Sequence, residues 1–223
     1  LDNPNEKKEM LHIVLTGPPG VGKTTVAKLV SQLFFEMGYL ESGHVVEADR
    51  STLVGSYVGQ TALLVRQKVE EAMGGVLFID EVYALKRKDH SAADFGQEAI
   101  DTLCKLMDEY KGKFIVVAAG YPEETEVFIK SNPGLASRFK LKLNIDAYTP
   151  SEMCEILKFH AKKQHFRFSE NLENLLPDFC ENWVDTADPE DWGNAREATN
   201  LIDDMSRAYS NDTAKETIRE NGM

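Results

Sequence analysis

A glycine-rich turn near the start of the chain constrains the fold more than any other segment. The turn has the sequence Gly17-Pro18-Pro19-Gly20-Val21-Gly22-Lys23-Thr24, which matches the phosphate-binding spacing Gly-x4-Gly-Lys-Thr. The apolar run Leu11–Leu15 before it predicts a buried strand, and a helix is expected to begin at Thr24. Glycines let a backbone curl around phosphate oxygens, and the positive end of a helix dipole favours anions. The segment therefore predicts a strand, loop and helix that bind a nucleoside triphosphate.

Nine consecutive residues are expected to contact the nucleotide. They are Gly17, Pro18, Pro19, Gly20, Val21, Gly22, Lys23, Thr24 and Thr25. Among them, Lys23 would reach the β- and γ-phosphates, and the Thr24 hydroxyl would hold Mg²⁺. An ordinary strand-to-helix turn with a solvated lysine would not need this spacing of glycine, lysine and threonine.

From Leu11 to about Ile145, apolar runs alternate with amphipathic helical patterns, as in a parallel sheet covered on both faces. Five strands are predicted: Leu11–Leu15, His44–Ala48, Val76–Asp80, Phe114–Ala119 and Lys140–Ile145. Helical patterns cover Thr24–Met37, Thr61–Met73 and Phe95–Tyr110. The fold class is therefore expected to be α/β with a five-stranded parallel sheet.

After the last strand a helical domain is expected, so we divide the chain into a nucleotide-binding domain over residues 1–147 and a small helical domain over residues 148–223. Thr149-Pro150-Ser151-Glu152 is a capping box with proline at the first helical position. Helices are predicted over Ser151–Gln164, Ser169–Val184 and Asn194–Tyr209. Pro177 is expected to interrupt the second of these helices, and the tail from Asn211 is expected to fray.

The apolar run of the third predicted strand, Val76–Ile79, ends in two carboxylates, at the edge where open parallel sheets bind ligands. Asp80 suits the water shell of the Mg²⁺ that Thr24 contacts, and Glu81 would polarise the attacking water. This arrangement favours hydrolysis of the nucleotide over transfer of phosphate to a metabolite. An acidic pair at a strand end can also simply cap a helix, but the phosphate-binding turn favours the catalytic interpretation.

Composition narrows the partners and the compartment. The chain has 25 Lys and Arg against 37 Asp and Glu, and its net charge of -12 argues against a broad nucleic-acid footprint. No apolar run approaches the ~18 residues of a membrane span, and the polar start Leu1–Glu6 is not a signal peptide. Cys104, Cys154 and Cys180 lack metal-ligand spacing and are expected to be buried thiols. We therefore expect a cytoplasmic location and no membrane span.

Four further segments stand out beside the glycine-rich turn: Leu53–Thr61, Gly74–Glu81, Ala119–Tyr121 and Ser131–Phe139. Together with the turn they resemble the CbxX/CfxQ family of AAA+ ATPases, which includes red-type Rubisco activases and ATPases of sporulation and type VII secretion. The resemblance extends from about Leu11 to Tyr209. It implies a P-loop domain with a helical lid, ATP and Mg²⁺ as ligands, and a homo-oligomeric ring of six expected copies that acts on an unidentified client protein.

The resemblance also implies roles for two arginines. Arg138 is similar to the arginine finger that enters the neighbouring subunit's site and stabilises charge on the γ-phosphate. Arg196 resembles the second sensor, which reads the γ-phosphate from the lid and moves it. A surface arginine beside the last strand is the alternative for Arg138. For Arg196, a helix start is an unfavourable place for a purely structural cation.

Tyr57, with Val58 beside it, resembles the aromatic pore-loop residue with which AAA+ rings grip a polypeptide. Gly55 and Gly59 flank the ring and would free the loop to move. The alternative is a half-buried tyrosine that packs at a helix start.

The first sensor is left open by the sequence. Tyr121 follows Gly120 where related ATPases often carry a polar sensor. Asn132 and the Tyr121 hydroxyl are the two candidates for its replacement.

Taken together, these features predict an ATP-driven ring that remodels or threads a protein. A nucleotide-gated switch or scaffold that assembles without threading is the alternative. A small-molecule kinase is disfavoured because Glu81, Arg138 and the helical lid would then lack a purpose.

Overall fold

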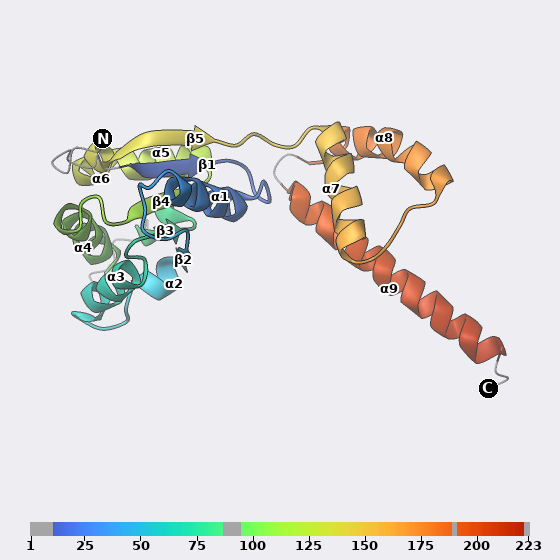
Figure 1. The fold of residues 1–223 in the computed structure, drawn as a ribbon, viewed down its shortest axis with the longest axis horizontal. Coiled ribbons are helices and arrows are strands. Elements are labelled where there is room, and N and C mark those ends of the chain that lie inside the picture. The colour runs from blue at the N-terminus through green and yellow to red at the C-terminus, as the bar shows by residue number, and fades with distance from the viewer. Residues whose placement is uncertain (1–10, 87–94, 189–190, 221–223) are drawn as a thin grey trace. The chain divides into compact units, whose positions relative to one another are not determined.

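The computed structural model describes residues 11–86, 95–188 and 191–220, and for residues 211–220 it describes the backbone alone. The polar start Leu1–Glu6, interpreted above, lies outside these ranges. The chain forms two compact units, which Figure 1 draws as ribbons. The first comprises Leu1–Gly17 and Gly22–Ile145, and the second combines the loop segment Pro18–Val21 with Asp146–Met223.

A single parallel sheet forms the centre of the first unit, with the strand order β2-β3-β4-β1-β5. The strands are β1 (His12–Thr16), β2 (Val45–Ala48), β3 (Val76–Ile79), β4 (Ile115–Gly120) and β5 (Phe139–Asn144). All five predicted strands are confirmed, with no boundary moved by more than one residue. Ile13 in β1 pairs with Val117 of β4 on one side and with Leu141 of β5 on the other. Because the strands are parallel, their carboxyl ends share one edge of the sheet.

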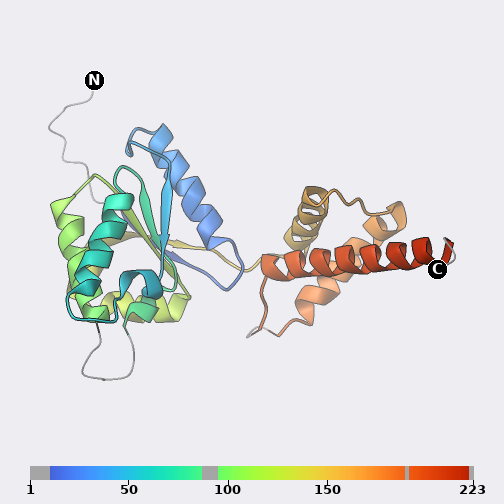
Figure 2. The same cartoon turned by 90° about the horizontal axis from the view of Figure 1, so that it is seen from below.

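Helices cover both faces of this sheet, as Figure 2 shows. Helix α1 (Lys23–Glu36) packs on one face, where its buried Ala27 joins an apolar cluster with the strands. Helices α3 (Gln60–Glu71) and α4 (Gly96–Glu109) cover the other face, and Leu103 is buried there. The predicted α/β class is therefore confirmed.

The described part of the first unit also contains four short elements: α2 (Arg50–Leu53), the 3₁₀ helix η1 (Val82–Leu85), α5 (Pro122–Lys130) and α6 (Pro133–Arg138). None of them was predicted from the sequence, because segments of nine residues or fewer show little helical periodicity. Start signals were nevertheless present. Both α5 and α6 begin with proline at the first helical position, and the Asn132 side chain caps α6.

The second unit contains three helices, α7 (Pro150–Lys163), α8 (Glu170–Asp185) and α9 (Ala195–Glu220). The predicted capping box at the start of α7 is confirmed, since Glu152 N donates to Thr149 Oγ1 at 3.3 Å and the Glu152 carboxylate accepts from Thr149 N at 2.8 Å. Leu157, Cys180 and Ile202 contribute one buried residue from each helix to a shared apolar core. This core stabilises the second unit.

Two expectations about these helices were wrong. Pro177 does not interrupt α8, which is continuous around it. The proline removes one backbone donor, while Leu176 and Cys180 on either side of it are buried in the core and hold the helix together. The tail does not fray at Asn211, because α9 extends to Glu220. The segment 214–220 is rich in Ala, Lys, Glu and Arg, which favour helix propagation.

The expectation for the cysteines is confirmed for two of the three. Cys154 and Cys180 are buried, whereas Cys104 is half-buried, and all three are free thiols. Cys104 lies on α4, whose outer part meets solvent, so its thiol is only partly covered by the core. Burial raises the pKa of the Cys180 thiol to about 12, so this group is protonated and unreactive at neutral pH.

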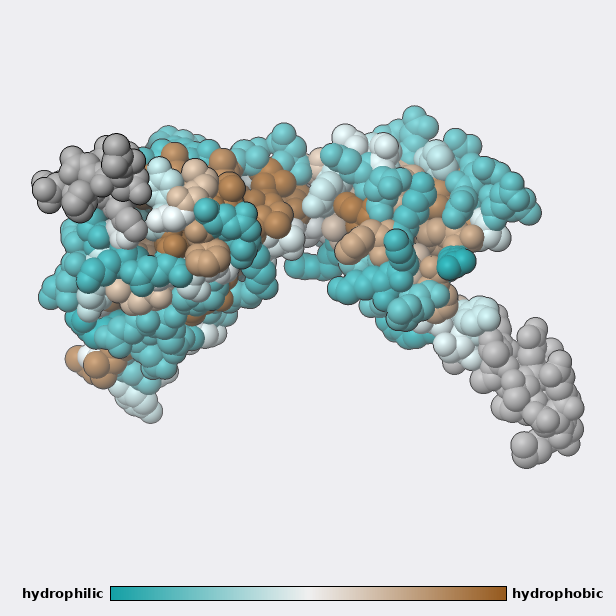
Figure 3. All heavy atoms as spheres, viewed as in Figure 1, coloured by the Kyte–Doolittle hydropathy of each residue, from teal (hydrophilic) through white to brown (hydrophobic). Residues whose placement is uncertain are grey.

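The surface is mainly hydrophilic on the face drawn in Figure 3, which agrees with the excess of acidic residues. Some apolar side chains nevertheless reach solvent on α1 and β5. They are Leu29, Leu33, Phe35, Leu141 and Leu143. Across the described ranges, no helix is long and apolar enough to cross a membrane.

Candidate active site

The phosphate-binding turn connects β1 to α1 and has the backbone of an anion cradle. Gly20 and Gly22 have φ of 70° and 84°, in the left-handed region that glycine adopts without strain. Gly22 occupies the N-cap position of α1, so no side-chain oxygen caps the helix there, and the first turn holds no acidic residue. The first N–H groups of the helix can therefore donate hydrogen bonds to phosphate oxygens.

Lys23 begins α1 beside this cradle. Its Nζ donates a hydrogen bond to the Gly17 carbonyl at 2.9 Å and lies 5.4 Å from the centre of the Tyr121 ring. The next two residues of the helix, Thr24 and Thr25, are half-buried and exposed, respectively. Lys23, Thr24 and Thr25, whose side chains are expected to contact phosphate and metal, therefore lie at the start of the helix directly after the loop.

The predicted carboxylates Asp80 and Glu81 follow β3 at the same edge of the sheet. Both are exposed, and Asp80 Oδ1 accepts a hydrogen bond from Glu81 N at 3.0 Å. Glu81 has a φ of 46°, a left-handed conformation that costs a non-glycine residue about 1 kcal/mol. This conformation ends the strand and starts η1. An open pocket of about 750 Å³ lies beside them, with Asp49 and Ser51 in its lining.

The donor set at this edge fits Mg²⁺. A threonine hydroxyl and a carboxylate are hard oxygen ligands, and Mg²⁺ in nucleotide sites takes few protein ligands because phosphates and water supply the rest. In the part of the chain that the structure describes, no three His, Cys, Asp or Glu residues are grouped to hold a metal on their own. Thr24 and Asp80 are therefore the residues that would hold the ion together with a nucleotide.

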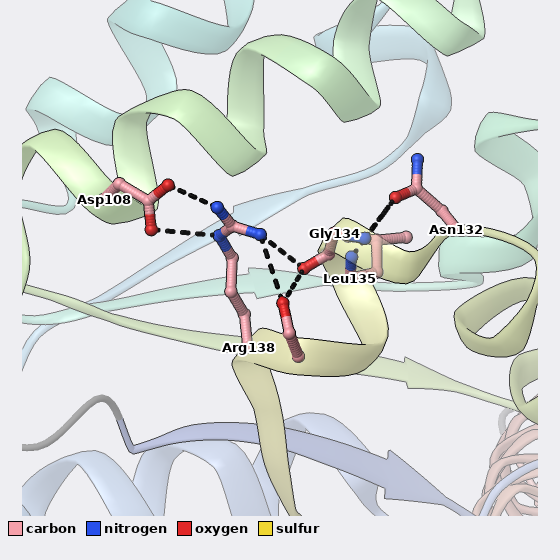
Figure 4. A network of polar contacts seen from close by, with 6 residues as sticks. Asp108, Asn132, Gly134, Leu135 and Arg138 are labelled. Carbon is pink, nitrogen blue, oxygen red and sulfur yellow. Dashed lines mark hydrogen bonds and ion pairs between the residues drawn. The ribbon is translucent and has the colours of Figure 1, made fainter.

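Arg138, the last residue of α6, is bound by residues of the same chain, as Figure 4 shows. Its Nε donates to Asp108 Oδ1 at 3.2 Å, its Nη2 donates to Asp108 Oδ2, and its Nη1 donates to the Gly134 carbonyl at 2.6 Å. The side chain is 17% exposed. The hydrogen bond to Asp108 raises the pKa of Arg138, so the guanidinium is always charged.

Arg196 belongs to the second unit, together with the tip of the phosphate loop. It is the second residue of α9 and its side chain is exposed. A Cβ at Gly20 would lie 1.8 Å from the Gly193 carbonyl oxygen and 3.3 Å from the Arg196 backbone nitrogen. Glycine at position 20 therefore permits close contact between the loop tip and the start of α9.

Two residues that hold this loop tip, Asn194 and Tyr148, were not predicted from the sequence. Asn194 Nδ2 donates to the Pro19 carbonyl at 3.0 Å, and its Oδ1 accepts from Tyr148 N at 3.2 Å. The Tyr148 hydroxyl donates to the Val21 carbonyl at 2.9 Å. Asn194 is buried with a φ of 49°, and the Gly-Asn dipeptide was the available signal, since Asn tolerates this conformation. The two side chains fix the orientation of the loop backbone.

Comparison with known families accounts for this arrangement. Residues 13–147 match the ATPase family associated with various cellular activities (AAA), and residues 149–223 match the AAA lid domain. The chain belongs to the AAA ATPases. The resemblance inferred from its motifs is therefore confirmed.

Relatives of this AAA ATPase have similar sequences over most of the chain. The stage V sporulation protein K of Bacillus subtilis is 41% identical over 91% of the chain and 62% of its own length. The chloroplastic ribulose bisphosphate carboxylase/oxygenase activase of Cyanidioschyzon merolae is 37% identical over 86% of the chain and 64% of its own length. A CfxQ homolog of Cyanidium caldarium is 38% identical over 86% of the chain. The chain thus spans less than two thirds of the length of these relatives.

A solved structure supports the fold alone. A Thermogota maritima RuvB mutant matches with a TM-score of 0.61 at 20% identity, over 94% of this chain and 62% of that chain. The likeness agrees with a P-loop domain followed by a helical lid.

The segment expected to form a pore loop in this AAA ATPase is exposed at its tip and braced at its base. Tyr57 and Val58 are 76% and 91% exposed, which excludes the half-buried alternative for Tyr57. Gly55 N donates to Thr61 Oγ1 and Ser56 N donates to Gln60 Oε1, both at 3.0 Å. The loop is therefore less free than two flanking glycines suggest, because side chains of α3 hold its first residues.

The two candidates for the first sensor differ in their surroundings. Asn132 Oδ1 accepts from Gly134 N at 2.8 Å and from Leu135 N at 3.3 Å, so it caps α6 (Figure 4). Tyr121 follows the end of β4, the strand between β1 and β3. Of the two candidates, Tyr121 is the residue near Lys23, whose Nζ lies 5.4 Å from the centre of its ring.

Proposed function

We propose that the chain binds ATP with Mg²⁺, hydrolyses it at contacts between copies of itself, and forms a ring, with six copies expected, that remodels or threads a protein. The position of Arg138, at the end of α6 and directly before β5, carries this proposal. Phe139, next to it, pairs with His12 at the amino end of β1, while the phosphate loop follows Thr16 at the carboxyl end. At about 3.3 Å per residue, β1 separates Arg138 from the loop by roughly 17 Å. Arg138 is therefore too far away for its own site and is suited to a neighbour's.

Each residue of the proposed site has a separate task. The loop N–H groups and Lys23 bind the phosphates, and bound Mg²⁺ would neutralise their charge while held by Thr24 and Asp80. Glu81 orients the attacking water and accepts its proton. Arg138 of the neighbouring copy stabilises charge that develops on the γ-phosphate. Arg196 links the state of the nucleotide to the lid.

Mixing two inactive variants tests catalysis between subunits. Glu81→Gln lacks the base but keeps Arg138, while Arg138→Ala lacks the arginine but keeps Lys23 and Glu81. In a mixed ring, some contacts combine an intact Glu81 with an intact Arg138, so ATP turnover should exceed that of either variant alone. Turnover equal to the average of the two variants would overturn the proposal.

A matched control uses a pair whose defects lie in the same site. Lys23→Ala and Glu81→Gln each remove a residue that must come from the same subunit, so no mixed contact is complete. Mixing these two should give no gain. Thermal unfolding of Arg138→Ala checks that its loss of activity is not a loss of folding, because this side chain also binds Asp108.

The alternative function, an ATP-gated switch or scaffold without threading, is separated by Tyr57→Ala. Exposed Tyr57 and Val58 support a grip on a polypeptide, because an exposed aromatic side chain offers contact that tolerates any sequence. We expect Tyr57→Ala to keep basal turnover and to lose stimulation by unfolded, fluorescein-labelled casein. Leu63→Ala, which removes another exposed apolar side chain, is the matched control. Unchanged stimulation in Tyr57→Ala would favour the switch.

The free thiols and the net charge bear on where the protein is located and on the kind of client it takes. We place the protein in the cytoplasm, since its three cysteines are free thiols of the kind that a reducing compartment maintains. The net charge of -12 supports a protein client over nucleic acid.

A further inference from the structure

Tyr121 lies at the centre of the candidate active site. Strand β4 pairs with β1 on one side and with β3 on the other, so its end lies between the phosphate loop and the two carboxylates. The Lys23 ammonium is 5.4 Å from the centre of the Tyr121 ring and donates to the Gly17 carbonyl at 2.9 Å. The ring and the carbonyl thus hold the same charged group from two sides.

A second tyrosine supports the ring of Tyr121. The Tyr83 ring, from η1, stacks on it with centres 5.9 Å apart and planes 25° apart. Gly120 makes room for this stack, because a Cβ there would lie 2.8 Å from Tyr83 Cε1 and 2.4 Å from Thr125 Oγ1. Burial, and then the charge of Glu81, raise the pKa of Tyr83, so its hydroxyl remains neutral at neutral pH. The Tyr121 ring is therefore held in place.

We propose that Tyr121 is a positioning residue for Lys23, with its ring face holding the ammonium group at the phosphate loop and Tyr83 fixing the ring. A lysine side chain is long and flexible, so it loses conformational freedom when it binds phosphate. An aromatic face attracts the ammonium without neutralising it, unlike a carboxylate, which would compete with the phosphates. The hydroxyl of Tyr121 has no part in this role.

The proposal rests on nucleotide binding by the phosphate loop, and calorimetry with ADP and a non-hydrolysable ATP analogue tests it. Tyr121→Leu should weaken binding by roughly three- to tenfold, the range of a cation–π contact, while Tyr121→Phe should bind within about twofold of the wild type. Tyr110→Leu is the matched control, because Lys113 lies 6.0 Å from the centre of the Tyr110 ring, outside this site. It should bind as the wild type does.

A second measurement needs no nucleotide. The rate at which acetic anhydride modifies Lys23, followed by mass spectrometry, should rise about threefold or more in Tyr121→Leu, because the ring favours the charged amine over the reactive neutral form. Equal rates in the two proteins would overturn the proposal whether or not ATP is hydrolysed. Binding by Tyr121→Phe as weak as that of Tyr121→Leu would also overturn it and assign the role to the hydroxyl. Absence of turnover in a wild type that passes both tests would contradict the proposed hydrolysis alone.

Discussion

Asp108 on α4 accepts hydrogen bonds from both Nε and Nη2 of Arg138 on α6, so the proposed arginine finger is paired within its own subunit. The Asp108 side chain is 54% exposed, whereas that of Arg138 is only 17% exposed. A planar guanidinium held by two oxygens has a defined direction. Asp108 competes with a neighbour's phosphate for this guanidinium, because Nε and one N–H of Nη2 already donate to the carboxylate.

Asp108→Asn should therefore raise turnover per subunit. Removing the charge weakens a contact that competes with the γ-phosphate, and we expect an increase of about two- to fivefold at high protein concentration. The free energy of unfolding should fall by less than about 1 kcal/mol, since the substituted Asp108 side chain is 54% exposed. Asp101→Asn on the same helix is the control, because Asp101 binds Gln97 instead. Lower turnover in Asp108→Asn would show that the pair orients Arg138 for catalysis.

Glu81→Gln should bind ATP with the affinity of the wild type and hydrolyse it at least about 100-fold more slowly. Glutamine keeps the shape of the side chain and its exposed position after Asp80 but cannot accept the proton. Calorimetry gives the affinity, and single-turnover kinetics give the rate. Asp80→Asn is the comparison, since it should weaken binding of the nucleotide only when Mg²⁺ is present. Near-normal turnover in Glu81→Gln would assign the base to another residue.

The features that the sequence predicted are local in the chain, whereas the features that it missed are contacts between residues far apart in the chain. The five strands were predicted correctly because each is a local pattern of hydrophobicity, and the phosphate loop, Asp80 and Glu81 became site candidates through local spacing. Asn194 and its partner Pro19 are 175 residues apart, and the Tyr148 hydroxyl bonds a carbonyl 127 residues away. No local pattern reports such pairs. The Asp108 partner of Arg138, 30 residues away, was missed for the same reason.

Asn194→Ala should destabilise the second unit and weaken nucleotide binding. It removes two hydrogen bonds and places alanine at a φ of 49°, so the free energy of unfolding should fall by roughly 2–3 kcal/mol. Asn194→Gly separates the two causes, because glycine accepts this φ but makes neither bond. Chemical denaturation and calorimetry with ADP provide the measurements. If Asn194→Gly binds nucleotide as the wild type does, the side chain does not hold the loop.

His12 should make the fold sensitive to acid. Its side chain is buried in β1, where Nδ1 accepts a hydrogen bond from Val116 N at 2.9 Å. Burial, and then the charge of Arg138, lower its pKa from 6.5 to about 4, against an opposing effect of Asp108. Between these two values the unfolded chain binds a proton that the folded chain does not. The stabilisation by neutral His12 is therefore complete above pH 6.5 and is lost as the pH falls toward 4.

The size of this effect distinguishes His12 from the carboxylates that also titrate in acid. A shift from 6.5 to about 4 corresponds to about 3 kcal/mol of unfolding free energy. His12→Asn keeps an oxygen that can accept from Val116 N but does not titrate, so it should remove most of the loss between pH 6.5 and 4.5 while lowering stability at pH 7. His160→Gln is the control, because this half-buried histidine loses less hydration and should leave the pH profile nearly unchanged. Denaturant unfolding at each pH measures both variants, and an unchanged slope in His12→Asn would assign the acid sensitivity to other groups.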